Sequence, residues 1–147
     1  MGSMVHVKDE GSVFEAPVDV VWKYLQSEID HGAAHKGRRN FARKELGPGM
    51  LELSWEQETD GKWVKSANRL TFLPPVGFSV EPLEGPLAGS KFYNFYTPKG
   101  NHTEVTVVGE YTSKVIPAAQ LHQAVMANNE KVFKEDSEGL RAFAAKK

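Results

Sequence analysis

The sequence predicts an α+β protein in which one curved antiparallel sheet grips a long C-terminal helix over a cavity. The chain opens with a short strand and then a helical segment that begins near Pro17. A run of strands separated by turns follows, and a helical pattern from Pro117 to Lys147 closes the chain. This order of elements favours a binder of small molecules over any particular reaction.

The composition limits the kinds of protein that the chain can be. Its 147 residues suit one domain, expected over 4–147, with residues 1–3 a remnant of cloning. A net charge of −1 gives no overall field that would attract nucleic acid. No apolar run approaches the about 20 residues that cross a bilayer, so stable membrane insertion is not expected. The N-terminus lacks a signal-peptide core, and we expect a cytoplasmic protein of undetermined oligomeric state.

The first part of the chain is predicted to hold one strand and two short helices. Val5 to Phe14 has the pattern of a strand. Pro17 suits the first turn of a helix, because its missing N–H would have no partner there. Four apolar residues then share one helical face, namely Val18, Val21, Trp22 and Leu25. Ser27 is a suitable cap for a second short helix that ends near Gly37.

Six further strands are predicted before the closing helix, which makes a sheet of seven. Their expected ranges are Arg38 to Leu46, Met50 to Glu58, Lys62 to Leu73, Phe78 to Glu84, Ser90 to Thr97 and Thr103 to Lys114. Apolar and polar residues alternate most clearly in the second and the last of these ranges, which is typical of strands with one buried face. Turn signals separate them, including Asp60-Gly61 between the second and third ranges.

The segment Ala16-Pro17-Val18-Asp19-Val20-Val21-Trp22 and the order of elements resemble the START-like, or SRPBCC, superfamily. This superfamily includes the birch-pollen allergen, polyketide cyclases and lipid carriers. The resemblance implies a helix-grip fold: a seven-stranded curved antiparallel sheet around a long C-terminal helix, with two short helices between strands 1 and 2. It also implies binding or transport of a small hydrophobic, partly polar ligand, such as a lipid or a polyketide, in an internal cavity. The alternatives are a polyketide cyclase-like enzyme on the same scaffold and a protein-interaction module of the chaperone-activator type.

The strands and the closing helix supply candidate walls for such a cavity. Expected inward residues on the strands are Leu53, Trp55, Phe72, Val107 and Tyr111, together with Leu51, Val64, Leu70 and Val105. Aromatic residues lie on both faces of the strand Ser90 to Thr97, so the sequence leaves open which of its side chains face inward. On the helix the candidates are Val125, Asn129 and Phe133, with Asn129 expected to offer a donor and acceptors to a polar ligand group. A solid core without a cavity is the alternative.

Asn129 belongs to a row of polar residues on the apolar face of the closing helix. His122 and Asp136 lie seven residues before and after it, on or beside that face. Burying such groups is unfavourable unless each has a partner, and a partly polar ligand would supply partners. The alternative is that His122 and Asp136 reach solvent or pair with strand residues such as Arg69.

Two further clusters are weaker candidates for a site. His31 and His35 would share a face of the second short helix and could contact a ligand at the cavity mouth, although an exposed polar face is the favoured interpretation. A metal would need a third ligand from elsewhere, so no metal is expected. Five basic residues, Lys36, Arg38, Arg39, Arg43 and Lys44, are interpreted as the solvated edge of the sheet, and attraction of an anionic head group is the second interpretation.

Catalysis has no signature in this sequence. The chain lacks cysteine, a phosphate-binding loop, a dinucleotide fingerprint and the Gly-x-Ser-x-Gly motif, so no cofactor is expected. A cyclase-like activity would depend mainly on the shape of the cavity and one acid–base group. Whether the protein catalyses a reaction is therefore left open.

Overall fold

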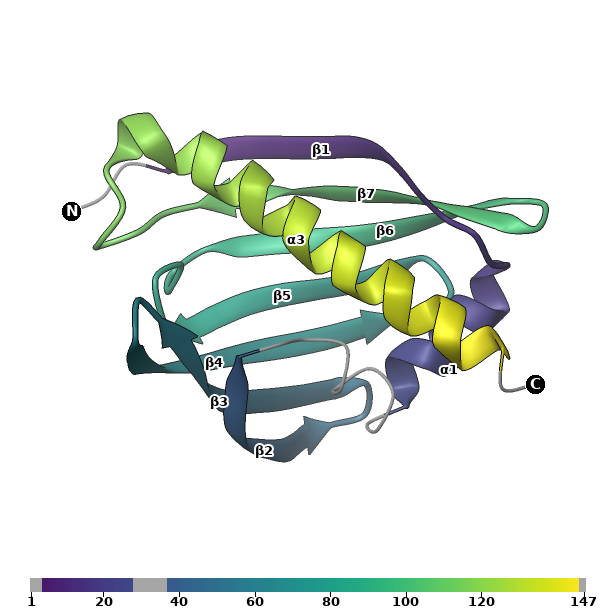
Figure 1. The fold of residues 1–147 in the computed structure, drawn as a ribbon, viewed down its shortest axis with the longest axis horizontal. Helices are drawn as coiled ribbons and strands as arrows, with labels where there is room; N and C mark the ends of the chain where they lie inside the picture. The colour runs from purple at the N-terminus through teal and green to yellow at the C-terminus, as the bar shows by residue number, and fades with distance from the viewer. Residues whose placement is uncertain (1–3, 28–36, 146–147) are drawn as a thin grey trace.

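The computed structural model describes residues 4–27 and 37–145 and shows a curved antiparallel sheet crossed by one long helix (Figure 1). The elements in chain order are β1 (Val5–Phe14), α1 (Val18–Gln26), β2 (Arg38–Gly47), β3 (Met50–Thr59), β4 (Lys62–Leu73), β5 (Gly77–Glu84), β6 (Lys91–Lys99), β7 (His102–Tyr111) and α3 (Ala118–Ala145). The helix-grip arrangement expected from the sequence is confirmed. The second short helix was predicted over 28–36, which lies outside the described residues.

The seven strands form one sheet in the order β1-β7-β6-β5-β4-β3-β2, and every neighbouring pair is antiparallel. All neighbours except β1 and β7 are consecutive in sequence, so the sheet is mostly a series of hairpins. Asp60 and Gly61 join β3 to β4 with φ angles of 51° and 78°. A two-residue turn with positive φ at both positions matches the twist of a hairpin, as the sequence signal indicated.

One row of paired residues shows which face of the sheet is concave. The row crosses six strands through Leu51, Leu70, Val80, Phe92, Gly109 and Val7. Val7 is buried in a cluster with Leu121 and Val125 of α3, so the whole row faces this helix. The side chains of β3, β4 and β7 that were predicted to face inward therefore do lie on the concave face. The same register places Phe92, Asn94 and Tyr96 of β6 on the concave face, which answers the question that the sequence left open.

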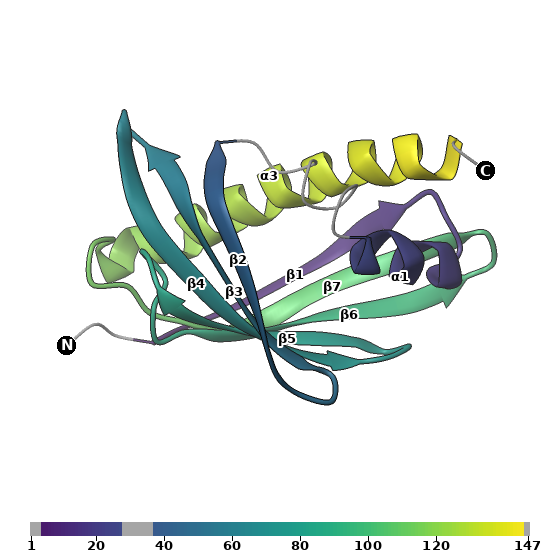
Figure 2. The same cartoon turned by 90° about the horizontal axis from the view of Figure 1, so that it is seen from below.

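The helix α3 covers only one side of the concave face. Its close contacts are with β1, β7 and α1. Two apolar clusters fill this region, one around Trp22, Tyr96 and Leu140 and the other around Val7 and Leu121. On the other side of α3, strands β2 to β4 slope up to the level of the helix, at a steep angle to β1, β7 and β6 (Figure 2). The packed core therefore lies beneath α3 on the β1–β7 side.

The strand β7 ends earlier than the sequence predicted. The expected range continued to Lys114, whereas β7 ends at Tyr111. The backbone N–H of Thr112 donates to Ser90 Oγ at 2.9 Å, and Ser113 Oγ accepts from the backbone N–H of Ile116 at 3.0 Å. These side-chain hydrogen bonds replace the strand ladder and turn the chain toward α3.

Candidate functional site

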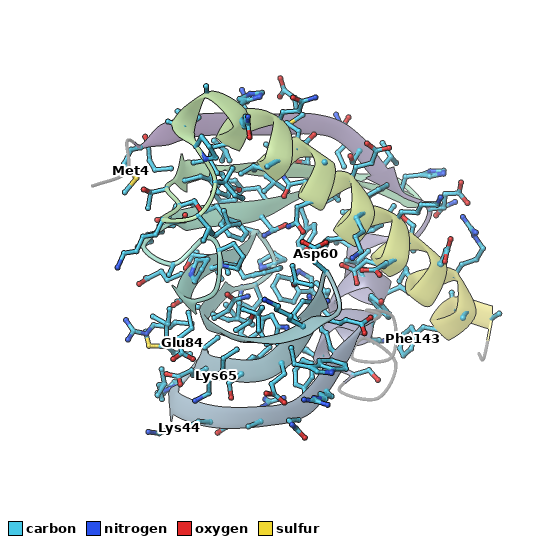
Figure 3. All side chains as sticks on the ribbon, turned by 60° about the vertical axis from the view of Figure 1, so that its left-hand side comes forward. Met4, Lys44, Asp60, Lys65, Glu84 and Phe143 are labelled. Carbon is cyan, nitrogen blue, oxygen red and sulfur yellow. The ribbon has the colours of Figure 1, made fainter. Side chains whose placement is uncertain are left out.

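The concave face is apolar, and much of it is only half-buried. Leu53, Phe72, Phe78, Phe92 and Val107 all lie on this face and all keep partial exposure to solvent. Side chains of this kind at the centre of a sheet would be fully buried in a solid core. In Figure 3 side chains of the sheet point toward α3, and Phe143 lies near the C-terminal end of this helix. Phe72, Phe78, Phe92 and Val107 also pack against the two buried clusters, so the candidate site is the half-buried concave face itself rather than an enclosed cavity.

Amide side chains interrupt the apolar floor of this site. Asn94 on β6 lies opposite Val107 on one side and Phe78 on the other, and it is half-buried. Asn68 on β4 lies opposite Leu53 and is also half-buried. The sequence did not indicate that Asn94 faces inward, because aromatic residues lie on both faces of β6. Only the pairing with β7 shows which side chains of β6 lie on the concave face.

Tyr111 and Asn129 lie at one end of the concave face, where Tyr111 is 1% exposed and belongs to the buried cluster of Val7, Leu121 and Val125. The ring of Tyr111 stacks on Phe92 with centroids 5.1 Å apart, and Gly109 leaves room for Phe92 because a Cβ there would collide with it. The Tyr111 hydroxyl and Asn129 Nδ2 are buried and have no hydrogen-bond partner among the described residues. Burial raises the pKa of Tyr111 strongly, while the amide of Asn129 acts in the opposite direction. The two groups therefore lie close together without the geometry of a hydrogen bond.

The other end of the site contains Arg38 and Trp55. The Arg38 guanidinium lies 4.6 Å from the centroid of the Trp55 ring, and its Nε donates to Gln57 Oε1 at 3.2 Å. Phe41 stacks on Trp55 with centroids 5.6 Å apart. The interpretation of the basic residues as a solvated sheet edge holds for β2, which is an edge strand with exposed residues from Arg39 onward. Arg38 is the exception, since it is half-buried on the concave side.

Acidic residues of α3 face Arg38 across the site. Burial lowers the pKa of Arg38, and the negative charges of Glu135 and Asp136 raise it against this effect. Asp136 is buried and accepts a hydrogen bond from the Tyr24 hydroxyl at 3.0 Å. Burial raises the pKa of Tyr96 strongly, and the charge of Asp136 contributes in the same direction. Asp136 therefore belongs to a polar cluster that joins α3 to α1 and lies near β2 and β6.

The pairing of the polar helix residues with Arg69 is not observed. Arg69 lies on the convex face, where its Nη1 is 3.6 Å from Glu81 Oε2. His122 is exposed, as the alternative interpretation expected.

The remaining candidates from the sequence lie in different surroundings. Val125 is 2% exposed and packs with Val7 and Leu121 in the core. Phe133 stacks on Phe14 at 4.8 Å and borders two surface grooves, of about 440 and 380 Å³, between α3 and β1. His31 and His35 lie outside the described residues.

The described part of the chain offers neither a metal site nor a membrane-spanning helix. Residues 4–27 and 37–145 contain no group of three or more histidines and carboxylates that could hold a metal ion. None of the described helices is both long and apolar enough to span a membrane.

Solved structures of other proteins are similar to this chain. The Zhui aromatase/cyclase from Streptomyces sp. R1128 is 15% identical over 94% of this chain and 92% of its own, with a TM-score of 0.71. Ara h 8.0201 is 13% identical over 95% and 99%, with a TM-score of 0.73. A START superfamily protein from Mycobacterium smegmatis is 11% identical over 95% and 97%, with a TM-score of 0.70. No protein-family model and no curated protein matches the sequence. These structural similarities show that the chain has the START-like, or SRPBCC, fold.

Proposed function

We propose that this protein binds or transports a small hydrophobic, partly polar molecule between the concave face of its sheet and α3. The observation that carries this proposal is the half-buried apolar surface formed by Leu53, Phe72, Phe92 and Val107. A ligand that covers this surface would gain the free energy of removing it from water. The similar structures support the proposal, since they include an aromatase/cyclase and a START superfamily protein.

The polar groups of the site indicate where a ligand would carry its oxygen atoms. Tyr111 and Asn129 lie toward one end, and Arg38 and Asp136 lie toward the other. Asn129 and Asp136 are seven residues apart on α3, which corresponds to about 10 Å along a helix. An apolar lining with a few placed polar groups is typical of sites for small molecules. The ligand is expected to have an apolar body and polar groups at both ends.

A polyketide cyclase-like enzyme on the same scaffold is the second candidate. The observation that favours it is the buried carboxylate of Asp136, which accepts from Tyr24 and lies close enough to Tyr96 to affect its pKa. A positioned carboxylate can transfer protons to and from a bound substrate. Incubation with a linear poly-β-ketone thioester, followed by mass spectrometry, tests this candidate. Loss of water that the Asp136→Asn variant no longer catalyses would support an enzyme.

A pair of variants on β7 tests the binding site itself. Val107 faces the concave side, whereas its neighbour Val108 lies opposite Lys8 and Tyr93 on the convex side. Val107→Phe fills space in the site and should weaken binding of the neutral fluorescent probe N-phenyl-1-naphthylamine by about tenfold, or about 1.4 kcal/mol. Val108→Phe adds the same volume outside the site and should leave the affinity unchanged.

Fluorescence titration of the probe against the wild type and both variants gives the result. Equal affinities in all three proteins would contradict binding on the concave face. Native mass spectrometry of protein purified without added ligand complements the titration. A mass above that of the chain, lost on denaturation, would identify a ligand acquired in the cell.

A further inference from the structure

The strand β1 forms one edge of the sheet, and α3 lies along this edge. Among the described strands β1 pairs only with β7, so its other edge carries backbone N–H and C=O groups that have no strand partner. The register with β7 shifts between Asp9 and Ser12, where Glu10 and Gly11 form a β-bulge. The regular pairing resumes at Ser12, and the segment that follows offers a regular edge to a further strand.

Two adjacent grooves separate β1 from α3. They have volumes of about 440 and 380 Å³, and Phe133 borders both. The two elements run in the same direction, because Val7 packs with Leu121 and Phe14 stacks on Phe133. Toward its C-terminal end α3 leaves this edge and lies beside α1 (Figure 1). The grooves therefore follow the edge of β1.

The larger groove has a length and an apolar lining that suit an extended peptide. On α3 it reaches from Glu130 to Ala144, which is about 21 Å at ~1.5 Å per residue. A strand of about seven residues covers this distance. Val13, Ala16 and Leu140 belong to its apolar lining, and Val13 is 41% exposed. A groove beside a free strand edge suits strand addition, in which backbone hydrogen bonds give affinity and side-chain contacts give specificity.

Charges of opposite sign lie toward different ends of the grooves. Lys134 and Arg141 border the larger groove and lie about 10 Å apart on one face of α3. Glu130 borders both grooves, and Asp9 borders the smaller one. Glu15 offsets one of the two positive charges at the larger groove. Within residues 4–27 and 37–145 none of these five side chains forms an ion pair, so each is available to a bound chain.

We propose that the groove beside β1 binds an extended peptide as an additional antiparallel strand of the sheet. Antiparallel pairing is slightly more stable per residue than parallel pairing. Because β1 and α3 run in the same direction, an antiparallel peptide begins beside Arg141 and ends beside Glu130. Charge complementarity then calls for an acidic residue at its start, a basic residue at its end and apolar residues at alternate positions between them. The inference does not depend on the proposed function, since the peptide uses the outer edge of β1 and not the concave face.

Three capped peptides test the inference. The first is acetyl-Asp-Thr-Val-Thr-Val-Thr-Lys-amide, in which the valines and both charged residues share one face of a strand. The second is the reversed sequence, acetyl-Lys-Thr-Val-Thr-Val-Thr-Asp-amide, which has the same composition and net charge. Calorimetric titration at about 0.15 M salt measures each affinity. We expect the first to bind the wild type about tenfold more tightly, because the reversed peptide places like charges together at both ends.

The third peptide tests backbone pairing without any change to the protein. It has the sequence of the first, with N-methyl groups on its first valine and on the threonine that follows. Successive N–H groups of a strand point to opposite sides, so one of the two would point toward β1. We expect this peptide to bind at least about tenfold more weakly than the first, because it loses a backbone hydrogen bond and the methyl group is placed against β1.

A double variant of α3 tests the charge argument at constant net charge. Glu130→Lys combined with Lys134→Glu exchanges the two charges in the groove and should bring the first two peptides to the same affinity. Lys131→Glu combined with Glu138→Lys is the matched control, because both residues are exposed on α3 and border neither groove. This control should keep the preference of the wild type.

Equal affinities of the wild type for the first two peptides would overturn the inference, as would the absence of binding by both. Equal binding of the N-methylated peptide would overturn it too, because the backbone of β1 would then not be used. An unchanged preference in the groove variant would contradict the assigned direction of the peptide. Sedimentation equilibrium examines the other occupant: a dimer of the wild type that the groove variant loses and the control keeps would assign the groove to a second copy of this chain and overturn the inference.

Discussion

The hydroxyl of Tyr24 on α1 donates a hydrogen bond to Asp136 on α3 across 112 residues of sequence. Tyr24 is 1% exposed and Asp136 is 8% exposed, so the bond lies in the interior. A buried carboxylate needs donors to replace the water that it has lost. The first helix thus helps to hold a charged group of the last helix beside the proposed site.

Tyr24→Phe should lower the free energy of unfolding by about 1–3 kcal/mol, because the buried carboxylate of Asp136 loses a donor while the ring is kept. Urea denaturation measures the change. Tyr93→Phe is the control, since Tyr93 lies on the convex face and should change the stability by less than about 0.5 kcal/mol. A Tyr24→Phe variant as stable as the wild type would show that the bond is not needed.

Trp22→Ala should lower the free energy of unfolding by about 3–5 kcal/mol, as expected for truncation of a buried aromatic side chain. Trp22 packs edge-on against the rings of Phe72 and Tyr96, and its Nε1 donates to the carbonyl of Pro75 at 3.1 Å. Trp63→Ala removes an exposed indole and should cost about 1 kcal/mol or less. Unchanged melting together with lost probe binding would instead place Trp22 in the site.

Asn129→Leu should leave the fold intact, because a buried amide nitrogen with no hydrogen-bond partner in residues 4–27 and 37–145 is replaced by an apolar group of similar size. It should weaken the binding of 6-hydroxy-2-acetonaphthone, whose hydroxyl can reach the Asn129 end, and spare 2-ethylnaphthalene. Titration of both compounds against both proteins measures this. Equal affinities for the hydroxyl compound would show that Asn129 does not contact ligand, and a large loss of stability would show that its amide is a structural group.

The stability of the protein should fall as the pH rises above about 10. Burial raises the pKa of Tyr96 and of Tyr111, whereas an exposed tyrosine in the unfolded chain loses its proton near pH 10. The unfolded state then binds fewer protons than the folded state, so the free energy of unfolding decreases with pH in this range. Urea titrations from pH 8 to 11 measure the slope, which should be smaller in Tyr96→Phe. An equal slope in this variant would contradict the assignment to Tyr96.

Most of the fold could be predicted because its signals are local. The strand patterns of Val5–Phe14 and Lys62–Leu73 predict these two strands with the bounds that the structure has, and one apolar helical face predicts α3. Alternation reports which side chains face a core, and it does so residue by residue. The predicted end of β7 was wrong, because no Gly or Pro follows Tyr111 before Pro117, whereas side-chain hydrogen bonds of Ser90 and Ser113 replace the ladder there.

The polar end of the site could not be predicted in the same way. Arg38 is one of five nearby basic residues, and only its pairing opposite Gln57 and its position near Asp136 distinguish it from the others. Both relationships join parts of the chain that are distant in sequence. The alternation of β6 could not indicate whether Asn94 or its neighbours faced inward, because that choice depends on the register with β7.

The strand order also has a consequence for when the site can exist during synthesis. Within the described sheet, β1 pairs with β7, so that Val5 lies opposite Tyr111, while the other neighbours are joined by short turns. Closing so long a loop is entropically unfavourable, so the hairpins from β2 to β7 are expected to form before β1 joins them. The 28 residues of α3 emerge from the ribosome after all seven strands. The proposed site therefore lacks its covering helix until α3 has also been made.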